Sequence, residues 1–586
     1  MDLHWIDLIL IFGYLIIVAM IGFGVQRRAT QHIDGYFLAG RNVPWWMLGL
    51  SGCSSYIDIG GTMALVGAMF YLGLKSIWMT HIFWGWLIIC FYMAFQAKYI
   101  RRSGVMTFAE WNEGRFGTDR DAEYARISAA TFLLVLMIFN LMFMAVGTGK
   151  FAEEFLPFNR WQSALIVFGV VGIYVTLGGF FGVILTDIFQ TMLIAVGAII
   201  LGIMAFNTGS GVDFLIGKNP EWSSLAPVWQ LWPSYIENTP MAYQHYNTFG
   251  PIILAGFAWL IFRVLAGPHV WDFQFFLTTK SSRDASLAAG MWTVGYTLRW
   301  IIGCAFLILG IYYLGSEAGF DAEKIMPLVL KKLPIGMRGL FMAILLAALM
   351  STLSAMINVT SSVFTNDFLK RYFIKGLSQK QLVRFGQLAS VFAITLAFIF
   401  SLSFNDIVSA WETMIFVVVT MILAPATMRW HWWRFSAKAF VWSMILSASI
   451  IIAQKIFLKD WPVHYWLTFD SLTSLFICVV LGFYFKPTRL ETLVNFYSKV
   501  RPFGFWKPVR LEAEKKGLVP VNDSMPRFDI LNGFLSVFFQ ISLALIPFFL
   551  FLRQWQNMII WILILVILSI ILYFTWYKKL PTPHEI

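Results

Sequence analysis

Runs of roughly 18 to 25 apolar residues recur along the whole chain, and they constrain its fold more than any other feature. A run of this length can cross about 30 Å of hydrocarbon as an α-helix that rises about 1.5 Å per residue. Only 13% of the 586 residues are charged, about half the share in a water-soluble domain. The sequence therefore predicts an all-α polytopic membrane protein.

We expect about fifteen membrane spans. They cover residues 5–25, 44–70, 77–97, 127–149, 162–178, 183–206, 250–275, 289–314, 339–367, 386–403, 407–428, 439–455, 465–485, 531–551 and 559–577. Loops rich in Lys and Arg alternate along the chain with loops that contain few of these residues. Positively charged loops lie on the cytoplasmic side of a membrane, so the pattern predicts an external N-terminus and a cytoplasmic C-terminus. The net charge of +12 then reflects anchoring beside anionic lipid heads in the cell (inner) membrane rather than nucleic-acid binding.

The predicted orientation divides the chain into five units. Spans two to six begin on the cytoplasmic side and spans seven to eleven begin outside, which is the layout of a five-plus-five inverted-repeat transporter core. The units are an extra N-terminal span and loop, a first repeat, an external loop, a second repeat and C-terminal accessory spans with a cytoplasmic loop at 486–530. Their residues are 1–43, 44–206, 207–249, 250–430 and 431–586.

Several classes of chemistry find no support in the sequence. The four cysteines lie inside apolar runs without metal-ligand spacing, and we interpret them as packing residues. The N-terminus lacks the features of a cleaved signal peptide, so the first apolar run is expected to remain as a span. We find no catalytic dyad, phosphate-binding loop or metal motif, so neither an enzyme nor a cofactor is predicted.

The second span is interrupted by small and polar residues at mid-depth. Ser51, Gly52, Ser54, Ser55 and Asp58 lie within it, and these residue types weaken a helix because they add backbone entropy or compete for backbone hydrogen bonds. An unwound centre would free carbonyls that can coordinate a cation. A stripe of small residues for close helix packing is the alternative, but packing does not explain a carboxylate at mid-span. We therefore expect a discontinuous helix.

The ninth span carries a second polar cluster, which consists of Ser351, Thr352, Ser354 and Asn358. Sodium is a hard cation, and hydroxyl and carbonyl oxygens suit it by the logic that governs calcium ligands. Alternatively, such hydroxyls bond back to the carbonyl four residues earlier and only bend the helix. The residues alone leave both interpretations open.

Four separated motifs resemble the sodium:solute symporter family, which includes the sodium–glucose and sodium–proline transporters. The motifs are the stretch from Gly40 to Trp46, the stretch from Tyr174 to Gln190 with Gly178-Gly179 and Thr186-Asp187-x-x-Gln190, the stretch from Ala347 to Ser354 followed by Phe364 to Asp367, and Gln274 to Ser281. The resemblance covers residues 36 to about 430, and the second and third motifs are the most specific.

The resemblance implies a sodium ion, as the coupling ion, between the first and eighth core helices. Its ligands would be the carbonyls of Ser54, Ile57 and Ala348 with the hydroxyls of Ser351 and Thr352. Asp187 matches an acidic residue that the family places near the inner end of the ion path. The alternative for Asp187 is an inner-surface carboxylate at a helix N-terminus.

The resemblance also implies a solute site beside the unwound segment. The candidate contacts are Tyr56, Asp58, His81, His269, Trp271, Asp272, Arg299 and Glu412. Arg299 matches the position of an intramembrane lysine in sugar-transporting members, and Trp271 falls near an aromatic gate residue. Alternatively, the two histidines are satisfied core residues, and Arg299 forms a structural ion pair with Asp272 or Glu412.

The sequence departs from the family pattern at three places. Gln274-Phe275 stands where members often have Gln-Arg, while Tyr56 and Gly60-Gly61 stand where sugar transporters carry amide or acidic side chains. The predicted function is sodium-coupled symport of a small polar solute, with a monosaccharide or sugar derivative preferred, by alternating access.

Two alternatives to this function remain. One is sodium- or proton-coupled uptake of an amino acid or other carboxylate, with Asp58 or Asp187 as the proton carrier. The other is a membrane sensor with a transporter-like fold, which segment 486–530 does not favour because it is short and lacks kinase or receiver motifs. The expected partners are the solute, sodium and the lipid bilayer.

Overall fold

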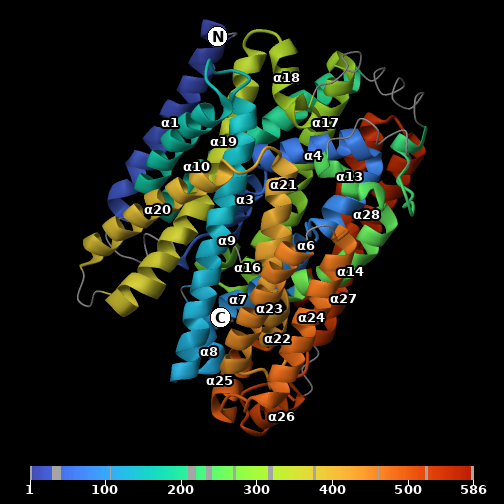
Figure 1. Cartoon of the computed structure of the whole chain (residues 1–586). Coiled ribbons are helices and arrows are strands. Elements are labelled where there is room, and N and C mark those ends of the chain that lie inside the picture. The colour runs from blue at the N-terminus through green and yellow to red at the C-terminus, as the bar shows by residue number, and fades with distance from the viewer. Residues whose placement is uncertain are drawn as a thin grey trace.

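The computed structural model describes residues 3–29, 41–105, 107, 109–208, 220–231, 241–267, 272–314, 321–373, 378–458, 461–521 and 525–581. Over these residues the chain is helical, with two isolated β-bridges, Val43–Thr279 and Trp432–Phe505. The helices form an elongated bundle, with α18 (Ile325–Lys332) at one end and α25 (Leu490–Val500) and α26 (Lys507–Lys515) at the other (Figure 1).

Eleven of the described helices are long and apolar enough to cross a membrane, and Trp5–Ile21 and Phe249–Leu265 are shorter apolar helices. The prediction of an all-α polytopic membrane protein is therefore confirmed, while the number of fifteen spans stays a prediction. The unit boundaries that we predicted from the sequence also stay a prediction. The other long helices of the bundle are α1 (Trp5–Ala29), α9 (Arg120–Ala152), α16 (Ser282–Gly295), α17 (Thr297–Leu314), α19 (Met337–Val363), α20 (Gln379–Ser401), α22 (Thr420–His431), α23 (Ala437–Phe457), α24 (Val463–Tyr484), α27 (Met525–Phe551) and α28 (Trp555–Thr575).

One predicted boundary is wrong. The spans predicted at 162–178 and 183–206 lie in a single continuous helix, α10 (Arg160–Asn207). Its paired glycines, Gly178 and Gly179, do not interrupt the backbone hydrogen bonding. A glycine inside a helix costs only about 1 kcal/mol relative to alanine, and packing against several neighbouring helices can offset that cost.

The first and second core helices are both interrupted. The first consists of α3 (Trp45–Ser55) and α4 (Ile59–Leu72), as the sequence predicts. The second was predicted as one span at 77–97, but η3 (Met79–Phe83) ends before α6 (Ile88–Phe91) begins. Gly85 has φ +74° in this gap, a conformation that only glycine adopts without strain.

The extra N-terminal helix supports the start of α19. The Asp7 carboxylate of α1 accepts hydrogen bonds from the backbone N–H groups of Gly336 and Gly339, each at 2.8 Å. These amides lie at the N-terminus of α19, where backbone donors lack partners within the helix. A Cβ atom on Gly339 would lie 2.4 Å from the Asp7 Cα. Glycine at position 339 therefore lets α1 approach the helix that carries Ser351 and Thr352.

Charged clusters join helices at both ends of the bundle. At the end that holds α18, Lys150 lies 2.7 Å from both Asp321 and Glu323. At the opposite end, Arg126 lies 2.6 Å from Glu113 and 2.7 Å from Asp367. These clusters tie α9 to the segments before α18 and after α19, and so fix the helix that runs past the centre of the molecule.

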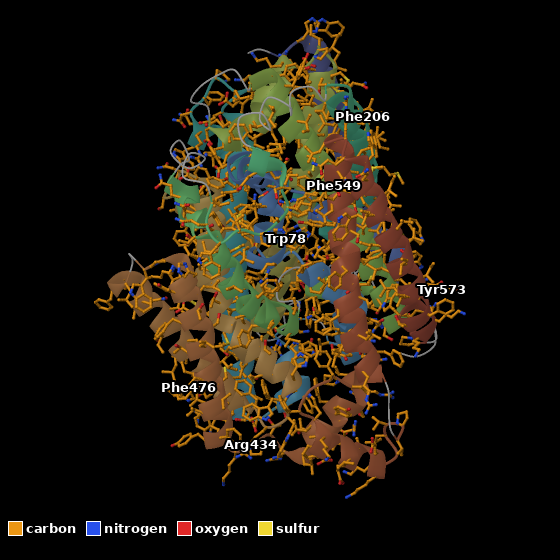
Figure 2. All side chains as sticks on the ribbon, turned by 90° about the vertical axis from the view of Figure 1, so that its right-hand side faces the viewer. Trp78, Phe206, Arg434, Phe476, Phe549 and Tyr573 are labelled. Atoms are coloured by element: carbon orange, nitrogen blue, oxygen red, sulfur yellow. The ribbon has the colours of Figure 1, made fainter. Side chains whose placement is uncertain are left out.

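The C-terminal accessory helices pack on two sides of the bundle. In the side view, Phe476 of α24 and Tyr573 of α28 lie on opposite sides, with Trp78 between them (Figure 2). α24 packs against α14 (Phe249–Leu265) and α22, and α27 packs against α17 and the second core helix. The accessory helix α27 thus packs directly against the second of the two interrupted helices.

We expect the substitution Gly339→Ala to lower the free energy of unfolding by about 2 kcal/mol, because overpacking of a tight contact typically costs that much. Thermal unfolding of the purified protein in detergent measures the change. The control is Gly13→Ala, in the same N-terminal helix, whose added Cβ meets no atom within 4 Å. Equal unfolding temperatures for the two variants would contradict this account of the α1–α19 contact.

Candidate functional site

The first core helix unwinds over three residues in the middle of the molecule. α3 ends at Ser55, where the N–H of Ile57 donates to the Ser54 carbonyl at 3.0 Å. α4 begins at Ile59, and the side chain of Asp58 caps it by accepting from the Gly61 N–H. Serines at the end of one half-helix and a capping aspartate at the start of the next are the residue types that such a break needs.

Hydroxyl groups of α19 meet the broken end of α3. The Ser351 Oγ lies 2.8 Å from the Ser54 Oγ and 3.3 Å from the Ser55 Oγ. The Thr352 hydroxyl donates to the carbonyl of Ser55 at 3.2 Å and to the carbonyl of Ala348 at 3.0 Å. All five residues are at most 2% exposed. We call this set of Ser54, Ser55, Ala348, Ser351 and Thr352 the oxygen cluster.

Four of the five residues that the resemblance implies as sodium ligands lie in the oxygen cluster. The fifth, Ile57, is buried two residues further along the unwound segment. Their assignment to sodium stays a prediction. Sequence reasoning missed Ser55, whose hydroxyl and carbonyl both contact α19. The adjacent pair Ser54-Ser55 was visible, but only the structure tells where the helix ends and which carbonyl faces α19.

Asp187 lies against the oxygen cluster. Its carboxylate accepts a hydrogen bond from the Ser51 hydroxyl at 2.5 Å and also interacts with the Ser351 side chain. It is completely buried within the continuous helix α10, so the alternative of an inner-surface carboxylate at a helix N-terminus does not describe it. Its second carboxylate oxygen has no hydrogen-bond partner among the described residues.

A cavity opens beside the unwound segment, between the two interrupted core helices. It has a volume of about 690 Å³, part of which is open to solvent. The lining residues are Ser55, Tyr56, Asp58, Trp84, Gly85, Trp86, Ile88, Ile89, Tyr92, Leu136, Asn140, Phe143, Met144, Arg263, Arg299, Thr352, Met356, Trp411, Met414, Ile415 and Val419. Because Ser55 and Thr352 belong to both sites, the cavity and the oxygen cluster share a wall.

Arg299 ties the unwound segment to the cavity wall. Its guanidinium donates to the Tyr56 carbonyl at 2.7 Å and lies 3.4 Å from the Asp58 carboxylate. It also lies 4.4 Å from the centre of the Trp86 ring, within range of a cation–π interaction. The alternative from the sequence, an ion pair of Arg299 with Asp272 or Glu412, is therefore wrong, because the arginine pairs with Asp58.

Asp272 connects the unwound segment to the second core helix. It begins α15 (Asp272–Thr278), which follows α14. Its carboxylate accepts hydrogen bonds from the hydroxyls of Tyr56 and Tyr92, the latter at 2.5 Å. Both tyrosines line the cavity, so Asp272 fixes two of the rings that border it.

The other solute candidates have different surroundings. His81 stacks on Trp300 at a ring distance of 5.0 Å, with one ring nitrogen 2.8 Å from the Ile77 carbonyl. Glu412 accepts from the Tyr246 hydroxyl and lies 3.2 Å from His245. The remaining two, His269 and Trp271, lie outside the described residues.

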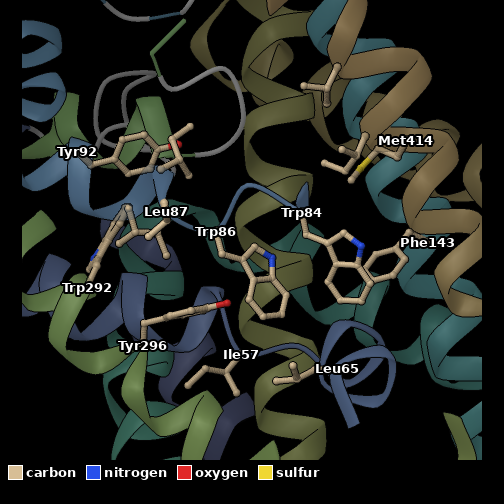
Figure 3. Close-up of a cluster of buried hydrophobic side chains, with 14 of the residues drawn as sticks. Ile57, Leu65, Trp84, Trp86, Leu87, Tyr92, Phe143, Trp292, Tyr296 and Met414 are labelled. Atoms are coloured by element: carbon tan, nitrogen blue, oxygen red, sulfur yellow. The ribbon is translucent and has the colours of Figure 1, made fainter. Parts of the chain in front are cut away.

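The aromatic wall of the cavity was missed by sequence reasoning. Trp84 and Trp86 flank Gly85, and their rings are 5.6 Å apart (Figure 3). Trp86 also packs edge-on against Tyr296 at 5.6 Å. The only trace in the sequence is the Trp-Gly-Trp triplet at residues 84–86, which is also compatible with a continuous helix.

Discontinuous helices beside a central cavity are the arrangement that secondary transporters use for their ion and solute sites. The chain belongs to the sodium:solute symporter family, whose pattern matches residues 36–447.

Two relatives and one solved structure illustrate the likeness. A sodium/glucose cotransporter of Vibrio parahaemolyticus is 26% identical over 529 residues, or 84% of this chain and 92% of that protein. Sodium/glucose cotransporter 4 of Danio rerio is 26% identical over 421 residues, or 67% of this chain and 62% of that protein. The substrate-bound outward-open structure of a Na⁺-coupled sialic acid symporter matches with a TM-score of 0.64 at 20% identity, over 83% of this chain and 99% of the other. That likeness confirms the predicted transporter fold.

We expect Arg299→Met to lower the free energy of unfolding by about 3 kcal/mol, because it leaves the buried Asp58 carboxylate without its partner. Arg299→Lys should lose less, since it keeps the charge but not the planar contact with Trp86. Chemical unfolding in detergent measures both variants. The account of Arg299 would be contradicted by a methionine variant as stable as the wild type.

Proposed function

We propose that this chain imports a small polar solute, a monosaccharide or sugar derivative, together with sodium by alternating access. The observation that carries the proposal is the wall that the oxygen cluster and the cavity share through Ser55 and Thr352. An ion bound on one side of this wall and a solute bound on the other would contact the same backbone segment. Such a shared segment is what reciprocal coupling between two ligands requires.

Sodium binding is proposed to draw the end of α3 and the middle of α19 together. The ligands are the residues inferred from the sequence, Ser54, Ile57, Ala348, Ser351 and Thr352, and we propose Ser55 in addition. In the structure the Ser54 and Ser351 hydroxyls hydrogen-bond to each other, and the Thr352 hydroxyl donates to the Ser55 carbonyl. With sodium, the oxygens would turn toward the cation, which accepts any arrangement of hard ligands. A membrane potential of 100 mV would add about 2.3 kcal/mol for each sodium charge moved inward.

The cavity lining suits a sugar-like solute. The rings of Trp84, Trp86 and Trp411 border it, and an aromatic face packs well against the C–H face of a sugar. Asp58 and Arg299 offer acceptors and donors for hydroxyl groups, which is the pattern of a mostly apolar pocket with a few placed polar groups. The names of the similar proteins, two sodium/glucose cotransporters and a sialic acid symporter, agree with this chemistry.

Proton coupling is a second candidate, and one observation favours it. Asp187 is a completely buried carboxylate with one oxygen that has no partner among the described residues, and a proton on that oxygen would remove the cost of the buried charge. We propose Asp187 as part of the ion path in either case. Uptake measured at fixed pH with sodium replaced by choline separates the two candidates.

We expect the double variant Ser351→Ala/Thr352→Ala to raise the sodium concentration for half-maximal uptake about tenfold or more, because it removes two of the proposed oxygen ligands. Sodium-dependent uptake into proteoliposomes measures the effect. The matched control is Thr360→Ala, on the same helix, whose hydroxyl donates to the Met356 carbonyl of α19 itself at 2.8 Å. An unchanged sodium dependence in a folded double variant would remove the assignment.

We expect an inward sodium gradient to drive uptake of a sugar from a panel of D-glucose, sialic acid and L-phenylalanine, with at least a fivefold advantage over a choline gradient. A sodium gradient speeds uptake only where ion binding and solute binding are coupled, and a choline gradient offers no such coupling. If L-phenylalanine alone is taken up, the amino-acid alternative replaces the sugar proposal.

A further inference from the structure

Buried polar side chains of the accessory helix α27 face the second core helix. Asp529, Ser536 and Gln540 are each at most 3% exposed, and Gly533 lies in the same row. Their spacing of four, three and four residues places them on one face of a helix. A buried polar row in a membrane helix is costly unless each member has a partner. All three polar side chains contact the second core helix.

Two of these side chains, Ser536 and Gln540, contact backbone carbonyls at the interruption of the second core helix. The Cys90 N–H donates to the Leu87 carbonyl, three residues earlier, rather than to the Trp86 carbonyl, four residues earlier, as in a regular α-helix. The Gln540 amide donates to the Trp86 carbonyl at 3.0 Å. The Ser536 hydroxyl is shared between the Cys90 carbonyl at 3.2 Å and the Gly533 carbonyl of α27 itself at 2.9 Å. Gln540 of the accessory helix therefore supplies the Trp86 carbonyl with a hydrogen bond that the broken helix does not make internally.

The lower contact is an ion pair. The second core helix continues from α6 without a gap through η4 (Tyr92–Gln96) into α7 (Ala97–Ser103). Asp529 pairs with Lys98 of α7 and accepts a hydrogen bond from the Tyr99 hydroxyl at 2.7 Å. The indole of Trp576, the residue directly after α28, donates to the Met93 carbonyl at 3.0 Å. The second core helix is thus held along its length, from Trp86 to Tyr99, by two helices that lie outside residues 36–447, the family match.

The side chain of Trp86, whose carbonyl accepts the hydrogen bond from Gln540, forms part of the cavity wall. Trp86, whose carbonyl Gln540 holds, presents its ring to Arg299 at 4.4 Å and to Trp300 at 5.9 Å. Arg299 in turn binds the Tyr56 carbonyl in the unwound first core helix. A shift of the Trp86 backbone would therefore move both the aromatic wall and the guanidinium that holds the unwound segment.

We propose that Gln540 is a positioning residue for solute binding, and that α27 sets the place of the Trp86 ring in the cavity. Gln540 acts through the Trp86 carbonyl, while Ser536 and Asp529 fix the register of α27 against the second core helix. The proposal rests on the proposed function for its effect on transport. Its structural part, the link between α27 and the interruption at residues 84–87, is independent of what the cavity binds.

The test compares Gln540→Met, which keeps the length of the side chain but removes the amide donor, with Ser542→Ala on the same helix. Ser542 is completely buried, and its hydroxyl donates to the Phe538 carbonyl of α27 itself at 2.7 Å. Hydrogen–deuterium exchange of the whole protein in detergent follows the peptide that covers residues 84–91. We expect about tenfold faster exchange in the methionine variant, since an unsatisfied buried carbonyl favours local opening, and no change in the control.

The second measurement is sodium-driven uptake of D-glucose into proteoliposomes. We expect Gln540→Met to raise the KM for D-glucose about fivefold or more, while the maximal rate and the half-saturating sodium concentration stay within about twofold of the wild type. A loss caused by misfolding would lower the maximal rate instead. The control variant should keep all three parameters.

Unchanged exchange at residues 84–91 would overturn the proposal, and so would faster exchange with an unchanged KM. If the wild-type protein moves no D-glucose, the proposed substrate fails on its own. In that case the exchange experiment still decides whether α27 holds the interruption of the second core helix.

Discussion

The contact between the end of α3 and the Ser351–Thr352 pair of α19 is the interaction on which the rest of the site depends. It exists because α3 stops at Ser55 and leaves hydroxyl and carbonyl oxygens facing a neighbouring helix. In hydrocarbon, such unpaired backbone groups are tolerated only where protein or water satisfies them. The surroundings of the break supply these partners through α19, through Arg299 and through the Asp58 cap. The unwound segment is thereby held in place by its neighbours.

Burial of charge shapes the region around this contact. Arg299 lies beside Asp58, and Asp272 receives two tyrosine hydroxyls. Buried ion pairs contribute little net stability, yet removal of one partner costs several kcal/mol. Because an unpaired buried charge costs more than the pair contributes, the polar groups of the site keep one geometry until a ligand replaces one of their partners. A helix outside the family match also contributes contacts to this region. α27 donates hydrogen bonds to backbone carbonyls of the second core helix.

The sequence predicted the membrane fold and the first helix break for clear physical reasons. Length and hydrophobicity define a span, and Ser, Gly and Asp at mid-depth indicate an interruption. The break at Gly85 was missed because a single glycine inside an apolar run is compatible with a continuous helix. The continuous α10 was missed because residues 162–206 contain two apolar runs of span length. The pairing of Arg299 with Asp58 depends on how helices far apart in sequence pack, and no local pattern encodes that.

The central claim is that oxygens from the end of α3, the unwound segment and α19 hold a sodium ion. A high-resolution structure of the purified protein, determined once in sodium and once in choline, tests this most directly. Our account predicts a spherical density within bonding distance of the Ile57 carbonyl and the Ser351 and Thr352 hydroxyls in sodium, and its loss in choline. Identical maps in the two salts, or a sodium ion bound away from α19, would contradict it.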